Sequence, residues 1–289
     1  MQEEVINLKL KLIVDSSADL PTELLKKYDI SVIPLRVYDQ FEKEYLDGGN
    51  LKASELMERM KNGENFTSSL PSYDAIYQTL VSNCTAQNCV YLTCSGDLSG
   101  TYNFAQLVKL DILENNPNAS IHIIDTRSVS LGIGVLVMEL IESLKIEEPF
   151  ENLINELNNN INKIQHIFTI EDLQYLIRGG RVGKFAGFLG GMLNINPIME
   201  ISEGKFKPLE KVRGRKKTIN RMLELIKIRK DELKRTVGVV YGVKDDSTEQ
   251  FIKQLQEMVG SENIIENSVG AAVGVHTGPS TLGIFFLSK

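Results

Sequence analysis

Short apolar runs alternate with amphipathic segments along the first half of the chain. Residues 11–14, 90–93 and 121–124 are mainly apolar runs of strand length, and each leads into a polar turn and then a helix. This unit of strand, hydroxyl-rich turn and helix occurs three times. The alternation predicts an α/β fold that begins with a parallel, Rossmann-like sheet with helices on its faces.

The second half follows a different pattern. Apolar residues keep helical spacing from Phe150 to Ile164, which predicts one long helix bridging the halves. Beyond it we predict a hairpin at 198–201 and from Phe206, a strand at 237–241, a helix after Ser247 and a last strand at 284–287. These elements predict a second α/β domain with a mixed sheet. We place the boundary near residue 160, which gives an N-terminal domain 1–160 and a C-terminal domain 161–289.

Length and composition agree with two globular domains. The chain has 289 residues, of which 42% are apolar and 24% are charged, the profile of an ordinary soluble protein. No charge-free apolar stretch reaches about eighteen residues, so we expect no transmembrane segment and only transient contact with a membrane. The acidic first residues, with no apolar run behind them, argue against a secretory signal.

The cysteines are Cys84, Cys89 and Cys94. An odd and small number of cysteines suits a reducing compartment, so we expect free, buried or half-buried thiols in a cytoplasmic protein. Three thiols without a nearby histidine make a poor zinc site, and no metal is expected.

Positive charge is concentrated in residues 213–235, which hold ten Lys or Arg against three acidic residues, although the net charge of the chain is −6. Apolar residues recur within this stretch at helical spacing. The stretch is interpreted either as a solvated helix face or as a docking surface for an acidic partner. Because the whole chain is acidic, we expect no binding of nucleic acid.

Hydroxyl side chains gather at two predicted turns that lead into helices. One turn contains Ser95 and Ser99, and the other contains Thr67, Ser68 and Ser69. In an open parallel sheet, ligands bind beyond the carboxyl ends of the strands, and free amides at helix starts attract anions. Two interpretations remain open, a small-anion site or ordinary helix capping. No glycine-rich phosphate loop with a Lys-Ser/Thr pair is present, which argues against a nucleotide phosphate.

One of the three histidines is a candidate site residue. His122 and His166 lie in predicted strands and are interpreted as structural. His276 lies in a glycine-rich segment, 270–279, that we predict to be a turn before the last strand. No nucleophile and base pair can be named from the spacing.

Glycines mark two further places. Gly179 follows a short predicted helix and is expected at its carboxyl end as a cap. Gly187, Gly190 and Gly191 lie in an apolar segment, where small residues let another helix or a ligand chain approach the backbone.

With these residues identified, the chain resembles the DegV family, lipid-binding proteins that supply fatty acid to bacterial fatty-acid kinases. The resemblance extends from about Lys11 to Leu287. The motifs that carry it, in this order, are Asp15-Ser16-Ser17-Ala18-Asp19-Leu20-Pro21, Val32-Ile33-Pro34-Leu35, Ser68-Ser69-Leu70-Pro71-Ser72, Leu98-Ser99-Gly100-Thr101-Tyr102, Asp125-Thr126-Arg127, Arg178-Gly179-Gly180-Arg181 and Gly274-Val275-His276-Thr277-Gly278-Pro279.

The resemblance implies a two-domain DegV-like fold with a long-chain fatty acid between the domains, no cofactor, and a separate fatty-acid kinase subunit as partner. The residues carried over as ligands of the fatty acid's carboxylate are Thr67, Ser68, Ser69, Ser95, Ser99 and His276. Arg178, Arg181 and Arg213 are assigned as candidates for docking the partner. Two positions depart from the family pattern, since Ser68 replaces its usual threonine and Ser280 its usual glycine.

Two other functions remain open. The first is a small-molecule enzyme, similar to dihydroxyacetone kinases, that uses His276 as a nucleophile or base. The second is an interaction protein that acts through its basic helix alone. A polar pocket would favour the enzyme, and a narrow apolar tunnel would favour the lipid carrier.

Overall fold

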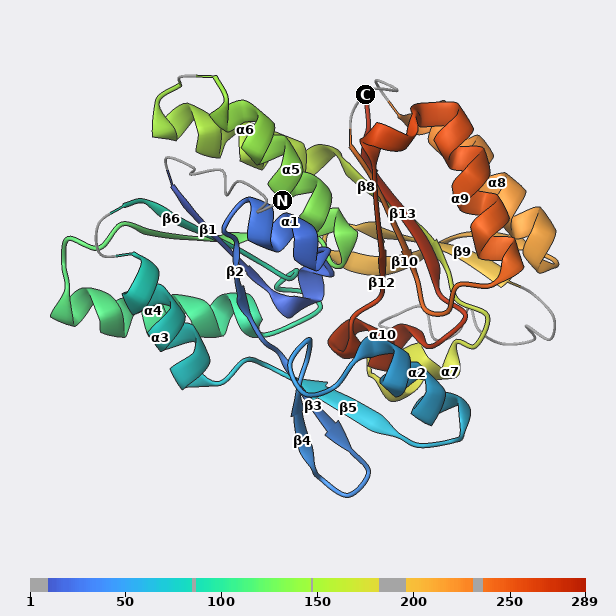
Figure 1. The fold of residues 1–289 in the computed structure, drawn as a ribbon, viewed down its shortest axis with the longest axis horizontal. Coiled ribbons are helices and arrows are strands. Elements are labelled where there is room, and N and C mark those ends of the chain that lie inside the picture. The colour runs from blue at the N-terminus through green and yellow to red at the C-terminus, as the bar shows by residue number, and fades with distance from the viewer. Residues whose placement is uncertain (1–9, 85–86, 147, 182–195, 231–235) are drawn as a thin grey trace, which may run out of the picture.

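The computed structural model describes residues 10–84, 87–146, 148–181, 196–230 and 236–289. Figure 1 shows two separate sheets, with α5 (Leu131–Leu144) between them and the remaining helices around the outside. The predicted α/β class with a parallel first sheet and a mixed second sheet is confirmed.

The first sheet has four parallel strands in the order β2-β1-β6-β7. They are β1 (Lys11–Asp15), β2 (Ser31–Ile33), β6 (Cys89–Thr93) and β7 (Ile121–Asp125). The three predicted strands are confirmed as β1, β6 and β7. Their continuous apolar runs follow from burial of both sheet faces, as is usual for parallel sheets. Helices α3 (Tyr73–Asn83) and α4 (Thr101–Asn115) pack on one face, whereas α5 and α6 (Phe150–Lys163) pack on the other.

The second sheet has six strands in the order β10-β9-β8-β13-β11-β12. They are β8 (Ile164–Thr169), β9 (Asn196–Ser202), β10 (Lys205–Val212), β11 (Val237–Tyr241), β12 (Ile264–Ser268) and β13 (Leu282–Leu287). Only β11 and β12 are parallel neighbours, and the other neighbours are antiparallel. The predicted β9–β10 hairpin is confirmed, and both turn residues, Glu203 and Gly204, have the positive φ that tight hairpins require. Helices α8 (Arg215–Arg229) and α9 (Asp246–Val259) cover the outer face.

A small third sheet was not predicted from the sequence. Its strands β3 (Arg36–Asp39), β4 (Glu44–Leu46) and β5 (Phe66–Ser69) lie in the order β4-β3-β5. Together with α2 (Ala53–Lys61) they pack against α10 (Ala271–Thr277) and share a buried apolar cluster with it. A segment of the first half therefore packs against α10, which belongs to the second half. The short helix α7 (Gln174–Arg178) also lies beside α10. The described residues also form α1 (Thr22–Lys27) and short 3-10 helices at Ser16–Ala18 and Ser261–Asn263.

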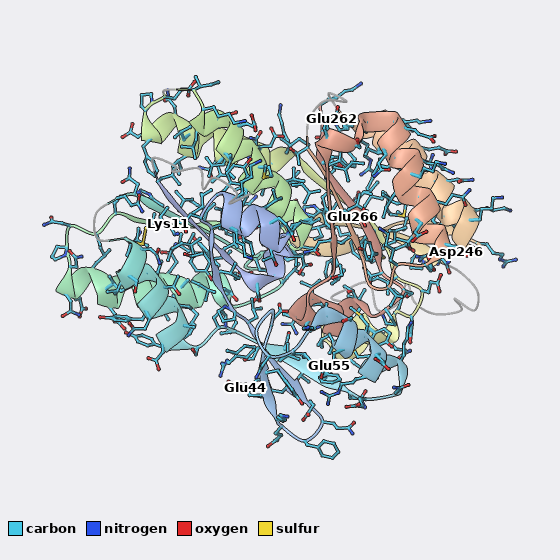
Figure 2. All side chains as sticks on the ribbon, in the orientation of Figure 1. Lys11, Glu44, Glu55, Asp246, Glu262 and Glu266 are labelled. Atoms are coloured by element: carbon cyan, nitrogen blue, oxygen red, sulfur yellow. A yellow bond between two sulfur atoms is a disulfide. The ribbon has the colours of Figure 1, made fainter. Side chains whose placement is uncertain are left out.

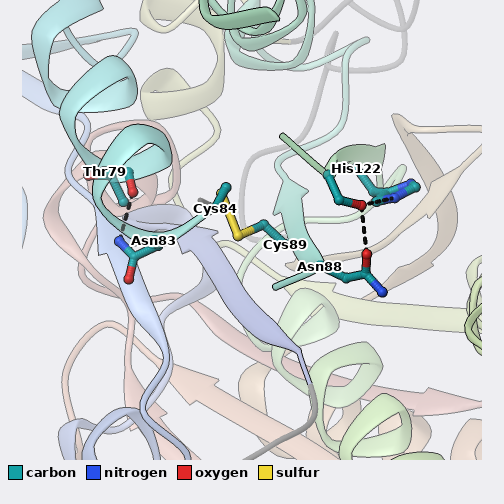
Figure 3. Close-up of a disulfide and its surroundings, with 7 residues drawn as sticks. Thr79, Asn83, Cys84, Asn88, Cys89 and His122 are labelled. Atoms are coloured by element: carbon teal, nitrogen blue, oxygen red, sulfur yellow. Dashed lines mark hydrogen bonds between the residues drawn. A yellow bond between two sulfur atoms is a disulfide. The ribbon is translucent and has the colours of Figure 1, made fainter. Parts of the chain in front are cut away.

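The expectation that all cysteines are free thiols is wrong. Cys84, at the end of α3, and Cys89, at the start of β6, form a disulfide, with 5.4 Å between their Cα atoms (Figure 3). Sequence spacing alone could not show that the helix end and the strand start lie side by side. Cys94 is free and buried, so the thiol argument for a reducing compartment now depends on one residue.

Two arginines of the basic stretch form ion pairs within the described part of the molecule. Arg221 pairs with Glu210 at 2.7 Å and with Glu224 at 2.8 Å, and Arg229 pairs with Glu200 at 2.9 Å. The apolar residues of α8 are buried against the second sheet. These contacts favour the solvated-face interpretation.

Other charged side chains, such as Glu44 on β4 and Asp246 on α9, point outward (Figure 2). Among the helices that the structure describes, none has both the length and the apolar character needed to cross a membrane.

Candidate functional site

A cavity of about 230 Å³ lies where the three sheets meet. Its wall combines the end of β5, the loop after β6, helix α10 and strand β10. The lining residues are Ser17, Leu35, Ser68, Ser69, Leu70, Cys94, Leu98, Ser99, Val129, Arg181, Phe206, Ala272, Val273, His276 and Thr277. The lining therefore combines polar and apolar side chains, and both halves of the chain contribute to it.

A second cavity of about 30 Å³ extends this space toward the second sheet. It shares Val129, Phe206, Val273 and Thr277 with the first cavity. Its other walls are largely apolar and include Phe168 and Phe285 as well as valines of β11 and the turn after β12. The two cavities together combine apolar walls with a few polar groups, as is usual for small-molecule sites.

His276 lies near the carboxyl end of helix α10, so the prediction of a non-helical turn at this position is wrong. The three glycines around it indicated a turn, but the segment is held as a helix by its burial among α2, α7 and β5. Its Nε2 lies 2.7 Å from the hydroxyl of Ser68, while its Nδ1 is buried without a hydrogen-bond partner among the described residues. Burial, and secondly the charge of Arg181, lower the pKa of His276 to about 4, so the ring is neutral at pH 7.

Gly179 has a role that the sequence did not reveal. It is the residue that caps α7, as predicted, with its N–H directed to the carbonyl of Tyr175 at 3.0 Å. A Cβ at this position would lie 1.9 Å from Nδ1 of His276. Glycine is therefore needed because the histidine ring packs directly against the backbone, which no spacing rule indicated.

Arg181 is the cation nearest to this histidine in the wall. Its Nε donates to the carbonyl of Leu98 at 3.2 Å and its Nη1 donates to the carbonyl of Gly179 at 2.6 Å. The guanidinium thus bridges the loop after β6 and the end of α7. Arg178 and Arg213 are exposed outside this wall, and Arg178 donates to Asn65 at 2.6 Å.

The predicted hydroxyl groups are only partly brought together. Ser68, Ser69 and Ser99 line the cavity, whereas Thr67 lies exposed on β5 and is not in the wall. Residues 67–69 form part of a strand rather than the turn we predicted, because pairing with β3 fixes this polar segment. Ser95 is also outside the wall. Its hydroxyl is fully buried and donates to the carbonyl of Gly204 at 2.8 Å, which attaches the β9–β10 hairpin to the loop after β6.

The other residues singled out in the sequence lie outside the cavity wall or outside the described residues. His166 is buried on β8, with Nε2 2.6 Å from the hydroxyl of Ser128, and His122 lies on β7. Gly187, Gly190 and Gly191 lie outside the described residues. No group of three or more metal-ligating side chains occurs among the residues that the structure describes.

Comparison with known proteins agrees with this arrangement. The profile of a family described as uncharacterised proteins of the DegV family matches residues 9–289. A DegV domain-containing protein of Clostridium acetobutylicum is 30% identical over 285 residues, which cover 97% of this chain and 99% of that protein.

Solved structures share the fold over nearly the whole chain. A fatty acid (stearic acid)-binding protein of Eubacterium ventriosum superposes with a TM-score of 0.86 at 27% identity, covering 98% of each chain. The fatty acid kinase B3 protein of Streptococcus pneumoniae, loaded with linoleic acid, superposes with a TM-score of 0.83 over 98% of this chain and all of that chain. At 23% identity, this second likeness shows the fold alone. The family match, the near-complete coverage and the shared two-domain fold establish that this chain belongs to the DegV family.

Proposed function

We propose that this protein binds a long-chain fatty acid in the cavity between domains 1–160 and 161–289 and presents the carboxylate to a separate kinase. The observation that carries the proposal is the polar wall at Ser68 and His276 opening into an apolar space. The protein of Eubacterium ventriosum with a similar structure is described as stearic acid-binding, which supports the same ligand class here.

The energetics support an acyl chain in such a space. Each buried methylene contributes about 0.8 kcal/mol, so a long chain gains on the order of 10 kcal/mol before the entropic cost of binding. A carboxylate buried without partners would cancel much of that gain. Ser99 and the Ser68–His276 pair supply donors: when Nε2–H of neutral His276 donates to Ser68, the Ser68 hydroxyl keeps its own hydrogen for the carboxylate. Hydrogen bonds to a charged group return roughly 1.5–3 kcal/mol each.

Presentation to a kinase is chemically compatible with a carboxylate held in this way. Neutral hydroxyls and an imidazole leave negative charge on the carboxylate oxygens, although Arg181 stands nearby. One oxygen can then attack the terminal phosphorus of the kinase's nucleoside triphosphate. A P–O bond forms to the acyl group as the bond to the nucleoside diphosphate breaks. Because this partner needs a nucleotide, we propose that the protein acts in the cytoplasm. The exposed Arg178 and Arg213 remain our candidates for docking the partner, with Arg181 at the cavity.

Denaturing the purified protein and identifying the released molecules by mass spectrometry tests the ligand class. We expect a long-chain fatty acid in stoichiometric amount. A polar metabolite, or delipidated protein that takes up no fatty acid from solution, would overturn the proposal and favour the small-molecule enzyme.

Two variants test the site. His276→Gln and Ser68→Ala should weaken fatty-acid binding, because each removes one partner of the 2.7 Å contact. His122→Gln is the matched control, since His122 lies on β7 and is not in the cavity wall. Equal binding by all three variants would contradict the placement of the carboxylate.

A further inference from the structure

Helix α10 carries His276, yet it has little intrinsic stability. It has only seven residues, and its N-cap residue Gly270 makes no side-chain capping bond. Gly274 lies within the helix and Gly278 ends it with a φ of +74°. Isolated helices of this length do not persist in water, and glycine lowers helix stability further. The position of α10 must therefore be set by groups outside it.

Two carboxylates from the first half hold the start of α10. Asp19 Oδ1 accepts from the backbone N–H of Gly270 at 2.9 Å, and Asp47 Oδ1 accepts from that of Ala271 at 2.7 Å. They lie 251 and 224 residues away along the chain from their donors, and both are buried. A Cβ on Gly270 would lie 2.5 Å from Asp19 Oδ1, so the backbone approaches this carboxylate as closely as glycine permits. Burial raises the pKa of both Asp19 and Asp47, and in either protonation state each carboxyl group keeps an oxygen that can accept from the start of the helix.

The second oxygen of each carboxylate is anchored to the first half. Asp19 Oδ2 accepts from the hydroxyl of Ser130, the N-cap residue of α5, at 2.5 Å. Asp47 Oδ2 accepts from the hydroxyl of Ser16 at 2.8 Å. The Ser16 hydroxyl oxygen in turn accepts from the N–H of Leu35 at 3.0 Å. Leu35 lines the cavity. The two aspartates therefore connect the start of α10 to the framework that carries the cavity wall.

The opposite end of α10 meets the first half through His276 and Ser68. We infer that Asp19 and Asp47 are positioning residues for the carboxylate site: they fix the start of α10 and thereby set where the His276 ring faces Ser68 and the ligand. This inference rests on the proposed function, because it concerns the same site. Neither aspartate lines the cavity, so neither touches the ligand.

Substitution of Asp19 by asparagine keeps its hydrogen bonds, whereas substitution of either aspartate by alanine removes them. In Asp19→Asn, the amide oxygen still accepts from Gly270 and the amide nitrogen can donate to the hydroxyl of Ser130. In Asp19→Ala and Asp47→Ala, the amide donors at the start of α10 lose their acceptors. The matched control is Asp245→Ala, which removes an aspartate that caps α9 by accepting from Thr248 at 2.8 Å, outside the cavity wall.

The experiment uses the full delipidated chain with ¹⁵N- and ¹³C-labelled histidine. Only three histidines are present, so His122 and His166 serve as internal references for His276. NMR reports the ring signals of His276 without ligand, and calorimetry with oleate reports affinity. We expect Asp19→Ala and Asp47→Ala to shift the His276 signals and to weaken oleate binding about tenfold, the loss expected for one hydrogen bond. Asp19→Asn should restore both readouts, and Asp245→Ala should lower the unfolding temperature only.

The inference is overturned if the His276 signals of the alanine variants match wild type, or if Asp19→Asn is as impaired as Asp19→Ala. If Asp47→Ala does not fold, Asp47→Ser, which shortens the side chain but keeps a hydroxyl near Ala271, must shift the same signals. Failure of wild-type protein to bind oleate or any other long-chain fatty acid would instead refute the proposed function. The NMR result without ligand would still decide the positioning role.

Discussion

Replacing Gly179 by alanine tests the close packing of His276 against the end of α7. The new Cβ would lie 1.9 Å from Nδ1 of His276. Ordinary contact between such atoms is about 3.5 Å, so the ring or the backbone must move by roughly 1.5 Å. We expect the ring to make this movement, which takes the 2.7 Å contact between Nε2 and Ser68 beyond hydrogen-bond range.

The expected cost can be estimated from this lost contact. Leaving a buried polar group without its partner costs about 1–3 kcal/mol, which corresponds to roughly 5- to 150-fold weaker binding of the fatty acid. Gly179 itself has φ −71° and ψ −8°, which alanine adopts without strain. The backbone change alone would therefore be neutral or stabilising, so weaker binding must come from the displaced histidine.

Calorimetric titration of delipidated protein with oleate measures this loss, and thermal unfolding monitors the fold. The matched control is Gly100→Ala, near the same cavity, where a Cβ would meet only Leu70 at ordinary contact distances of 3.4 and 3.6 Å. If Gly179→Ala binds fatty acid within about twofold of Gly100→Ala, the reasoning about His276 is wrong.

Three further outcomes are expected. Since the folded-state pKa of His276 is lowered to about 4 by burial and Arg181, the unfolded chain binds this proton first, and stability contributed by the neutral ring is lost as pH falls from about 6.5 to 4. His276→Gln should therefore lose less stability than wild type over that window in urea unfolding, and parallel curves would contradict it. Reducing the Cys84–Cys89 disulfide should lower the free energy of unfolding by about 2 kcal/mol, the value for a short loop, while Cys84→Ala should show no effect of reductant. Phe206→Ala should merge the two cavities that share this residue and shift binding toward bulkier acyl chains, as measured by competition between fatty acids, whereas an unchanged preference would mean that Phe206 does not limit the space.

Much of the fold could be predicted because burial leaves a periodic pattern. The strands β1, β6 and β7, the helix α6 and the β9–β10 hairpin all have clear apolar periodicity or turn residues. The polar strand β5 lacks such a pattern, since its residues Phe66–Ser69 are fixed by pairing with β3 rather than by their own preferences. Helix α10 was missed for the same reason, because its glycines indicate a turn and only tertiary packing makes it helical.

The sequence predicted the types of residue that line the site better than it predicted which positions reach the cavity. Ser68, Ser99 and His276 do line one cavity. Thr67 and Ser95 do not, because strand alternation and the bond to Gly204 direct their side chains elsewhere. Contacts between residues far apart in the chain, such as His276 with Gly179, leave no trace in local spacing.

The cavity wall includes residues from Ser17 to Thr277, and α10 packs against α2 and the small sheet β4-β3-β5. During translation, the ribosome must pass Thr277 before the pocket can close. The nascent first half would leave the α10-facing side of that sheet without its cover, which makes it a candidate surface for chaperone binding. The cavity is therefore completed only near the end of synthesis, and a truncation product that lacks α10 would lack part of the cavity wall even if its parallel sheet had formed.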